Sequence, residues 1–340
     1  MKQLIRFTAI LALLAPVAAV QAVPASATAP DRNGLIVFRA AAAEGDQLFT
    51  VRPNGTHLRQ ITHVPGDAAN PDWAPDGRHI AFGWGNASGA RISVVESDGS
   101  GLRTLPQPAG VFDDQPSYSA DGRKIYFERF VERSRDDAIW TMRADGSHQR
   151  RLLNPFPAGG VTDPNLSPDG RTLSFQGSDG SLVGPGSPGE PALGLFTADR
   201  RGRHIKQIRP FTTDQTIKVS WAPSGRRLAS TENANHLFPA DSANIVTMRP
   251  DGSDVRTVTA FHDGQTNAYL GSYSPDGRWL VFRLESHGLF GLYRVRPDGS
   301  DRRVILPLSS FRPSLIDWGP RPHRGDDDHH DDRVVGGGRH

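Results

Sequence analysis

Several short clusters of carboxylate, amide and imidazole side chains are the residues of this chain that could do chemistry. Those placed just ahead of predicted strands are Asp113, Asp114, Gln115, Asp163, Asp214, His262 and Asp263. Carboxylates with histidine can hold a divalent cation or transfer protons, and carboxylates with amides can bind a polar peptide backbone. No H-x-H, H-E-x-x-H or serine-elbow pattern fixes a catalytic or metal-binding geometry. The residue types therefore favour a binding site, and we expect no catalytic group, metal or cofactor.

A second cluster combines charged groups with an aromatic ring. Glu128, Arg129, Phe130 and Arg133 fall within residues 128–137, a stretch that we expect to be a loop. An exposed ring supplies apolar contact area, and the charges around it select an orientation, as is typical of a surface that binds a partner. These four residues join the candidate binding site.

The elements that position both clusters are copies of one short motif. The five copies begin at Trp73, Tyr118, Leu166, Trp221 and Tyr273. Each continues as Ser/Ala-Pro-Asp-Gly-Arg or a close variant and is followed by apolar residues two apart. Proline presets φ, aspartate can bond its own backbone, and glycine allows a positive φ, so each copy predicts a strand, a tight turn and a second strand.

A second glycine turn is interleaved with these hairpins. Its glycines, at intervals of 44 to 56 residues, are Gly55, Gly99, Gly146, Gly202, Gly252 and Gly299. Four strands per period are typical of β-propeller blades, so the chain is predicted to be all-β with six blades. The strand at 35–38 lacks a partner before it, and the strand at 314–320 lacks one after it. We expect these two to pair in one blade, which closes the ring and removes an open sheet edge.

The propeller arrangement predicts where the candidate residues lie. With strands named a to d from the axis outward, the a–b and c–d turns share one face, and the b–c and d–a connections share the other. The tight glycine turns occupy the first face, whereas both clusters of candidate residues fall on connections of the second. We therefore predict a polar ring around the channel mouth on the second face, where loop sequences differ between blades.

The two ends of the chain have the composition of processing and tail segments. Residues 1–27 combine a short basic start, an apolar stretch and small residues, which predicts a secretory signal peptide cleaved after Ala22 or Ala27. Residues 28–320 are assigned to the propeller, and residues 321–340, rich in His, Asp and Gly, to a disordered tail. We expect a secreted or periplasmic protein with no stable membrane span after cleavage.

Composition narrows the class of protein further. The 340 residues include no cysteine and carry 39 basic against 37 acidic side chains, a formal net charge of +2. Without disulfides, the fold depends on apolar packing between blades, to which the aromatic residues of the repeats contribute most. The basic residues are spread over the repeats and do not form a stripe with exposed aromatics, so we expect no nucleic-acid partner. We also expect a monomer.

The repeated motif resembles the blade motif of the TolB-like propellers with PD40-type, WD40-like repeats. Residues 73–78 and 273–278 match it closely, whereas Ala120 and Ser224 depart from it in two other copies. The resemblance implies a non-enzymatic propeller that binds a protein or peptide partner at its channel mouth, at the bacterial cell envelope.

Two other functions stay open at this point. Similar propellers occur in oligogalacturonate lyases, so the resemblance also allows a metal-dependent polysaccharide lyase. Its candidate ligands are the loop residues His63, His236, His262 and His287, with Asp113, Asp163 and Asp263. Export and rim aromatics suggest a carbohydrate-binding or cell-wall-binding propeller as the other alternative.

Overall fold

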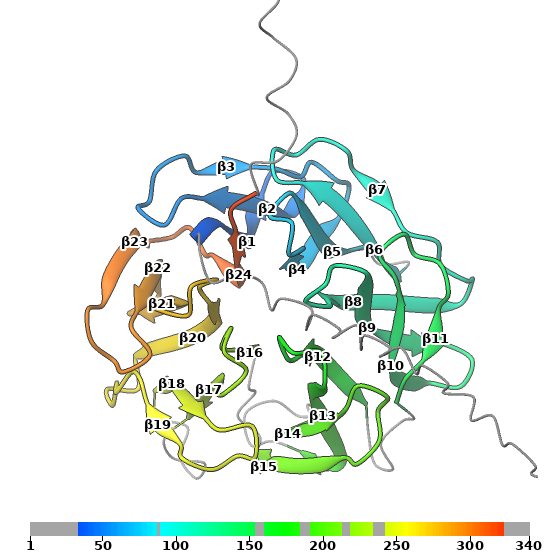
Figure 1. The fold of residues 1–340 in the computed structure, drawn as a ribbon. Coiled ribbons are helices and arrows are strands. Elements are labelled where there is room, and N and C mark those ends of the chain that lie inside the picture. Colours follow the sequence, from blue (N-terminus) through cyan, green and yellow to red (C-terminus); the bar gives the residue numbers. More distant parts are fainter. Residues whose placement is uncertain are drawn as a thin grey trace, which may run out of the picture.

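The fold is a ring of six antiparallel sheets, seen along its axis in Figure 1. The computed structural model describes residues 33–86, 89–153, 160–183, 191–212, 218–233 and 242–322. The predicted signal peptide and all but the first two residues of the predicted tail lie outside these ranges. Each sheet has four strands, and the elements of the described part of the chain are all strands. The predicted six-bladed β-propeller is confirmed.

The strands of each blade run from the axis to the rim in chain order, apart from the closing blade. Blade 1 consists of β4 (Asp67–Trp73), β5 (His79–Asn86), β6 (Gly89–Glu96) and β7 (Arg103–Thr104). Blade 2 consists of β8 (Val111–Tyr118), β9 (Lys124–Val131), β10 (Asp136–Arg143) and β11 (Arg150–Arg151). Blade 3 consists of β12 (Val161–Leu166), β13 (Thr172–Val183), β14 (Pro191–Asp199) and β15 (Lys206–Thr212). Blade 4 consists of β16 (Val219–Trp221), β17 (Leu228–Asn233), β18 (Ala243–Met248) and β19 (Arg256–Thr257). Blade 5 consists of β20 (Thr266–Tyr273), β21 (Leu280–Ser286), β22 (Leu289–Val295) and β23 (Arg303–Ser309).

The closing blade, blade 6, is built from both ends of the described chain. Its strands from the axis outward are β24 (Ser314–Pro320), β1 (Asn33–Ala42), β2 (Gly45–Val51) and β3 (Arg59–Gln60). β1 pairs with β24 in antiparallel register, with Ile36 opposite Trp318. The expected pairing of the two chain ends is therefore confirmed, and β1 is paired on both of its edges, with β24 and with β2.

Two kinds of glycine turn shape one face of the ring. In the five a–b turns the glycines have φ between 67° and 69°, and the N–H of Gly77 donates to the carbonyl oxygen of Ala74 at 3.0 Å. The c–d turns have glycines at φ between 74° and 88°. Both conformations lie in the left-handed region that favours glycine. We call the side that carries these turns the turn face, and the side that carries the b–c and d–a connections the loop face.

The core lies between neighbouring blades, as expected for a propeller without disulfides. Val37 and Leu48 of blade 6 share one apolar cluster with Trp73, Ile80 and Phe82 of blade 1. Burying one aromatic ring removes roughly 150–250 Å² from water, which is worth about 4–6 kcal/mol as an upper bound. Packing across each blade junction therefore holds the innermost strands at fixed positions around the axis.

Candidate functional site

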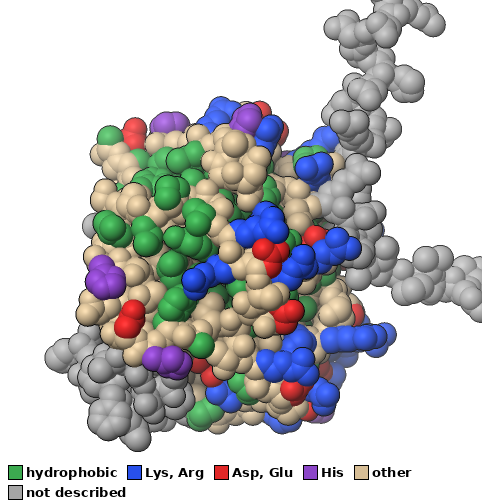
Figure 2. All heavy atoms as spheres, turned by 90° about the vertical axis from the view of Figure 1, so that its left-hand side faces the viewer, with side chains coloured by type: hydrophobic (Ala, Val, Ile, Leu, Met, Phe, Trp, Pro, Cys, Tyr) green, Lys and Arg blue, Asp and Glu red, His purple; other side chains and the backbone are tan. Residues whose placement is uncertain are grey.

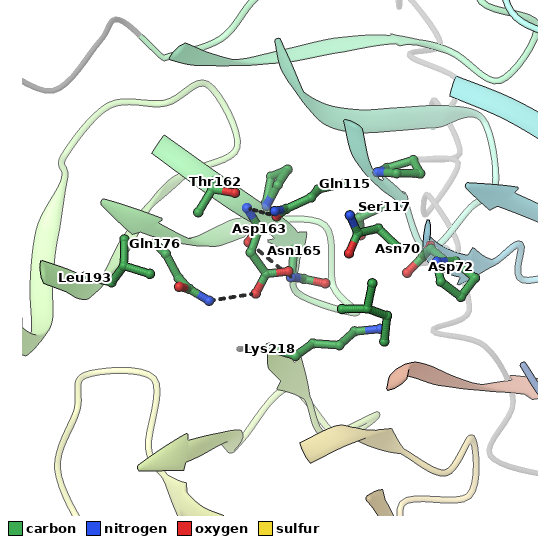
Figure 3. A pocket seen from close by; sticks show the side chains of 14 residues that line it. Asn70, Asp72, Gln115, Ser117, Thr162, Asp163, Asn165, Gln176, Leu193 and Lys218 are labelled. Atoms are coloured by element: carbon green, nitrogen blue, oxygen red, sulfur yellow. Dashed lines mark hydrogen bonds between the residues drawn. The ribbon is translucent and has the colours of Figure 1, made fainter. Parts of the chain in front are cut away.

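A cavity of about 210 Å³ lies on the axis of the ring. Figure 3 shows its lining, which comes mainly from innermost strands of several blades. The polar side chains that line it are Asn70, Asp72, Gln115, Ser117, Thr162, Asp163, Asn165, Gln176 and Lys218, and Leu193 and Leu315 are apolar members. We call it the axial pocket. It is the strongest candidate site, because polar groups from separate blades converge there.

A backbone irregularity in the innermost strands shapes this pocket. Asn70, Gln115, Asp163 and Leu315 stand at equivalent positions of four blades and have φ between 49° and 51°. The strand register shifts between Ala69 and Asp72, and the corresponding shifts occur in β8 and β12. Such bulges leave a residue out of the ladder and redirect the side chains around it. A positive φ at non-glycine residues costs free energy and is concentrated at functional sites, so its recurrence here marks the axis as a candidate site.

Three carboxyl groups and one ammonium group dominate the chemistry of the axial region. Asp72 accepts the backbone N–H of Tyr118 at 2.7 Å, and Asp317 accepts that of Trp73 at 2.9 Å. Asp163 accepts the N–H of Val219 at 2.9 Å, together with side-chain amides of its own blade. Lys218 donates its Nζ–H to the carbonyl oxygen of Ile316, two blades away, at 3.0 Å.

The electrostatics of these groups favour an additional positive charge. Burial raises the pKa of Asp72 well above its ordinary value, and the neighbouring carboxylate of Asp317 raises it further. Burial also raises the pKa of Asp163, while the ammonium group of Lys218 acts in the opposite direction. One lysine thus acts on two carboxyl groups, and Asp317 adds a third carboxyl group beside Asp72. A cationic ligand group would compensate the repulsion between the carboxylates and stabilise their ionised forms.

A second pair of carboxyl groups lies behind the pocket wall, where Glu128 of blade 2 contacts blade 3 and Asp114 of blade 2 contacts blade 1. Thr162 and the carboxyl group of Glu128 form a hydrogen bond, and Asn70 donates an amide N–H to Asp114 at 3.0 Å. Burial raises the pKa of Glu128 to about 8, and the charge of Asp114 contributes to this rise. Burial raises the pKa of Asp114 as well. Of the predicted site residues, Gln115 and Asp163 therefore line the axial pocket, whereas Asp114 and Glu128 stand behind it and bond to the lining residues Asn70 and Thr162.

Asp113 and Arg129, which we expected at the rim, are instead buried at 3% and 2% exposure. The Arg129 guanidinium forms two hydrogen bonds with the Asp113 carboxylate, at 2.6 and 2.7 Å. It also lies 4.6 Å from the ring centroid of Trp140. The two charges compensate each other inside blade 2, so neither group is free to meet a ligand.

The expected loop at 128–137 is mostly strand. β9 extends to Val131 and β10 begins at Asp136, so only four residues connect them. Phe130 stacks on Phe112 at a centroid distance of 5.9 Å and is half-buried, whereas Arg133 is exposed. Asp113, Asp114, Gln115 and Asp163 likewise lie within innermost strands and not ahead of them. Because side chains alternate along a strand, Glu128 and Arg129 point to opposite sides of the sheet.

The other predicted site residues are separate from the axial pocket. Asp263 accepts hydrogen bonds from the backbone N–H groups of Gln265 and Thr266 and from the Thr266 hydroxyl, which lower its pKa to about 2. This residue shapes its own turn on the loop face. His262 beside it is exposed, and Asp214 lies outside the described residues.

Sequence reasoning missed Asp72, Lys218 and Asp317. Asp72 and Asp317 stand directly before Trp73 and Trp318, the aromatic residues of the repeated motif. In sequence they are therefore not distinguishable from residues that only build the strand. The available signal was the variation at this position, which is Asp, Ser, Asn, Ser, Ser and Asp in blades 1 to 6. Aspartate and serine at this position both accept an N–H from the next innermost strand, so the charges of Asp72 and Asp317 exceed what the fold requires.

The lyase hypothesis requires a group of metal ligands on the loop face. Within the described ranges, no three His, Asp or Glu side chains are grouped closely enough to hold a metal ion. His63, His262 and His287 are exposed, and His236 lies outside these ranges.

Within the described residues, no helix is long and apolar enough to cross a membrane.

Comparison with known sequences gives partial matches. No family model matches the chain. An uncharacterized protein of Agrobacterium fabrum is 30% identical over 142 residues, which cover 38% of this chain and 47% of that protein. The Tol-Pal system protein TolB of Nitratidesulfovibrio vulgaris is 49% identical over 35 residues, or 10% of this chain and 8% of that protein. The chain thus matches less than half the length of these relatives.

Comparison with solved structures supports the fold over most of the chain. TolB from Acinetobacter baumannii superposes with a TM-score of 0.66 at 17% identity, covering 85% of this chain and 67% of that chain. A structure from Agrobacterium tumefaciens, titled as a TolB candidate, gives 0.60 at 14% identity and covers 85% and 99%. An oligogalacturonate lyase in complex with manganese gives 0.52 at 13% identity and covers 81% and 73%. Enzymes and binding proteins share this architecture, so the likeness shows the fold alone. The chain is a six-bladed β-propeller with the fold of the TolB-like propellers.

Proposed function

We propose that this protein is an exported, non-enzymatic binding module of the bacterial cell envelope, which takes a segment of a protein partner into its axial pocket from the loop face. The predicted signal peptide supports export, and the TolB-like fold supports a protein partner. We propose that the mature chain acts as a monomer and without a cofactor.

The observation that carries this proposal is the uncompensated group of carboxyl groups at the axis. Asp72 and Asp163 share one ammonium group, that of Lys218, while Asp317 adds negative charge beside Asp72, and the pKa of Asp72 and of Asp163 is raised. A lysine, arginine or terminal amine of a partner would find acceptors that are already held in place by backbone N–H groups. The partner segment is therefore expected to be basic, because its charge completes the pairing.

The geometry gives less support to a polysaccharide lyase. Such an enzyme needs a group of ligands for its metal, and the histidines expected to provide it are exposed on separate connections or lie outside the described residues. The axial pocket instead presents carboxyl and amide groups, together with the side chain of Lys218. These groups suit the backbone and cationic side chains of a peptide.

The proposal is tested by capturing envelope proteins with the mature chain and with two double variants. Asp72→Asn with Asp163→Asn removes both charges but keeps oxygen acceptors for the N–H groups of Tyr118 and Val219. Glu96→Gln with Glu132→Gln removes the same charge at exposed positions and serves as the control. The proposal expects a partner that is retained by the control and lost by the axial variant. Identical recovery by all three proteins would contradict it.

A further inference from the structure

The small net charge of the chain conceals a concentration of positive charge on the turn face. The eleven turns of the turn face carry twenty-two Lys and Arg against twelve Asp and Glu, whereas the other described residues carry eleven against sixteen. The turn segments are 52–59, 74–79, 96–103, 119–124, 143–151, 167–172, 199–206, 222–227, 249–256, 274–279 and 296–303. Figure 2 views the ring from the side and shows Lys and Arg gathered toward one half of the visible surface. One face of the ring is therefore strongly cationic.

Exposed apolar side chains recur on the outer rim of this cationic face. The described residues include six exposed large apolar side chains, and four of them stand directly before an outermost strand, at 42% to 47% exposure. These four are Leu58, Leu102, Ile205 and Val255. Each is followed by a basic residue, in the order Arg59, Arg103, Lys206 and Arg256. Single exposed apolar residues are ordinary, but here four blades present the same pair of an apolar and a basic side chain.

The common turn geometry places these pairs at one level. In all six c–d turns the glycine N–H donates to the carbonyl oxygen three residues earlier, at 2.8 or 2.9 Å. Because the same turn ends every blade at this face, the residues that follow it lie at equivalent heights around the ring. The pairs therefore form a rim that can meet a flat surface in several places at once.

The recesses of the turn face are cationic as well. A cavity of about 440 Å³ at the closure is lined by Arg52, Arg294 and Arg321 and by no acidic residue among those described. The Nε atom of Arg294 is buried there without a hydrogen-bond partner. A second cavity, of about 430 Å³ between blades 2 and 3, is lined by four basic and two acidic residues, Lys124, Arg150, Arg200, Arg201, Asp121 and Asp169. Anionic groups would be accepted at both places.

We propose that the turn face binds the surface of an anionic phospholipid bilayer. The arginines and lysines would meet the phosphate groups, and the four rim side chains would enter the boundary between headgroups and acyl chains. A bilayer fits better than a soluble polyanion, because only a bilayer offers an apolar layer beneath its charged surface. The loop face would then point away from the membrane. This inference concerns the opposite face from the proposed partner site and does not depend on it.

Vesicle co-sedimentation tests the inference. The probe is a vesicle of phosphatidylcholine with about one third phosphatidylglycerol, compared with pure phosphatidylcholine. We expect the chain to bind only the anionic vesicles. Each basic residue near such a surface is worth about five-fold in affinity, so replacing Arg59, Arg103, Lys206 and Arg256 with Gln should weaken binding by at least about 100-fold.

Two further variants separate the alternatives. A control variant loses the same four positive charges at exposed residues outside the turn face, through Arg91→Gln, Arg133→Gln, Arg135→Gln and Arg312→Gln. This control should bind vesicles like the unaltered chain. A second variant replaces the four rim side chains with serine, through Leu58→Ser, Leu102→Ser, Ile205→Ser and Val255→Ser. It should bind vesicles at least about ten-fold more weakly, while its binding to heparin, a soluble polyanion, should be unchanged. Equal loss in both four-charge variants, or vesicle binding insensitive to the serine replacements, would overturn the inference. The second result would assign the face to a soluble polyanion. Retained thermal unfolding transitions would show that each variant is folded.

Discussion

The Oδ2 atom of Asp317 accepts the backbone N–H of Trp73 at 2.9 Å, which bonds the last strand of the ring to blade 1. Asp72 receives the N–H of Tyr118 from the next blade in the same way, at 2.7 Å, and Ser272 receives that of Trp318 at 2.8 Å. These contacts join successive innermost strands beside the axis. The side chains that shape the axial pocket therefore also connect the blades.

Replacing Asp317 should separate its acceptor role from its charge. Asp317→Ala leaves the N–H of buried Trp73 without an acceptor, which costs about 1–3 kcal/mol of unfolding free energy. Asp317→Asn keeps an oxygen at this place and should cost less than about 1 kcal/mol. Urea unfolding followed by tryptophan fluorescence measures both. Equal losses in the two variants would show that the charge, and not the bond to Trp73, matters.

The buried ion pair in blade 2 makes a second prediction. Arg129→Met leaves the Asp113 carboxylate buried without its partner, and removing one member of such a pair costs about 3–5 kcal/mol. The double variant Arg129→Met with Asp113→Leu removes both charges and should recover much of this loss. Denaturant unfolding of the two variants and the unaltered chain gives the comparison. A double variant as unstable as Arg129→Met would contradict the assignment of these residues to a structural pair.

Glu128 should make the stability of the fold depend on pH. Its pKa in the folded state is about 8, above the ordinary value of 4.5, because burial disfavours the ionised form. The folded chain therefore holds this proton more tightly than the unfolded chain, and stability is lost as pH rises from about 4.5 to about 8. The loss reaches at most about 1.4 kcal/mol per pH unit.

Glu128→Gln should remove this component, since the amide cannot ionise but can accept a hydrogen bond from Thr162. The difference in unfolding free energy between the variant and the unaltered chain should grow in favour of the variant between pH 5 and pH 8. Asp114 and Asp163 interact electrostatically with Glu128, so removing its charge also favours their ionisation and adds to the same trend. A difference that stays constant over this range would rule out a buried, protonated Glu128.

The a–b turn glycines offer a graded test of the closure. Gly77 and Gly277 have φ of 68° and 69°, so alanine at either position should cost about 1 kcal/mol or more. A Cβ at Gly77 would also lie 2.6 Å from the carbonyl oxygen of Pro320 in the closing strand, whereas at Gly277 its nearest contact is 3.4 Å from Pro223. Gly77→Ala should therefore lower the melting temperature more than Gly277→Ala. The reverse order would argue against the packing of the closure.

Most of the architecture could be predicted from the sequence because its determinants are local. The Asp-Gly turns need a positive φ that few residues provide, and their spacing counts the blades. The closure followed from two unpaired strands, since an open sheet edge is unfavourable. The error at residues 128–137 arose because charged residues resemble a loop in sequence, whereas here Arg129 is paired inside the sheet.

The site was less accessible to sequence reasoning, because convergence at the axis depends on residues far apart in the chain. The sequence predicts Asp114, Gln115, Glu128 and Asp163 as polar residues of one face; Gln115 and Asp163 line the axial pocket, and the other two bond to residues of its wall. Lys218 could not be assigned, because its role depends on reaching the carbonyl oxygen of Ile316, 98 residues away. The excess of basic residues on the turn face is also not apparent from the net charge, because the net charge sums over the whole chain.

Peptide binding at the axis is the measurement that addresses the central claim most directly. Isothermal titration would compare two short peptides with the same glycine scaffold, one bearing lysines and one bearing glutamates. We predict that the lysine peptide binds and that the Asp72→Asn, Asp163→Asn variant weakens it at least about ten-fold, whereas Glu96→Gln, Glu132→Gln does not. Equal binding of the two peptides, or a lysine peptide that binds the axial variant as well as the unaltered chain, would contradict the account.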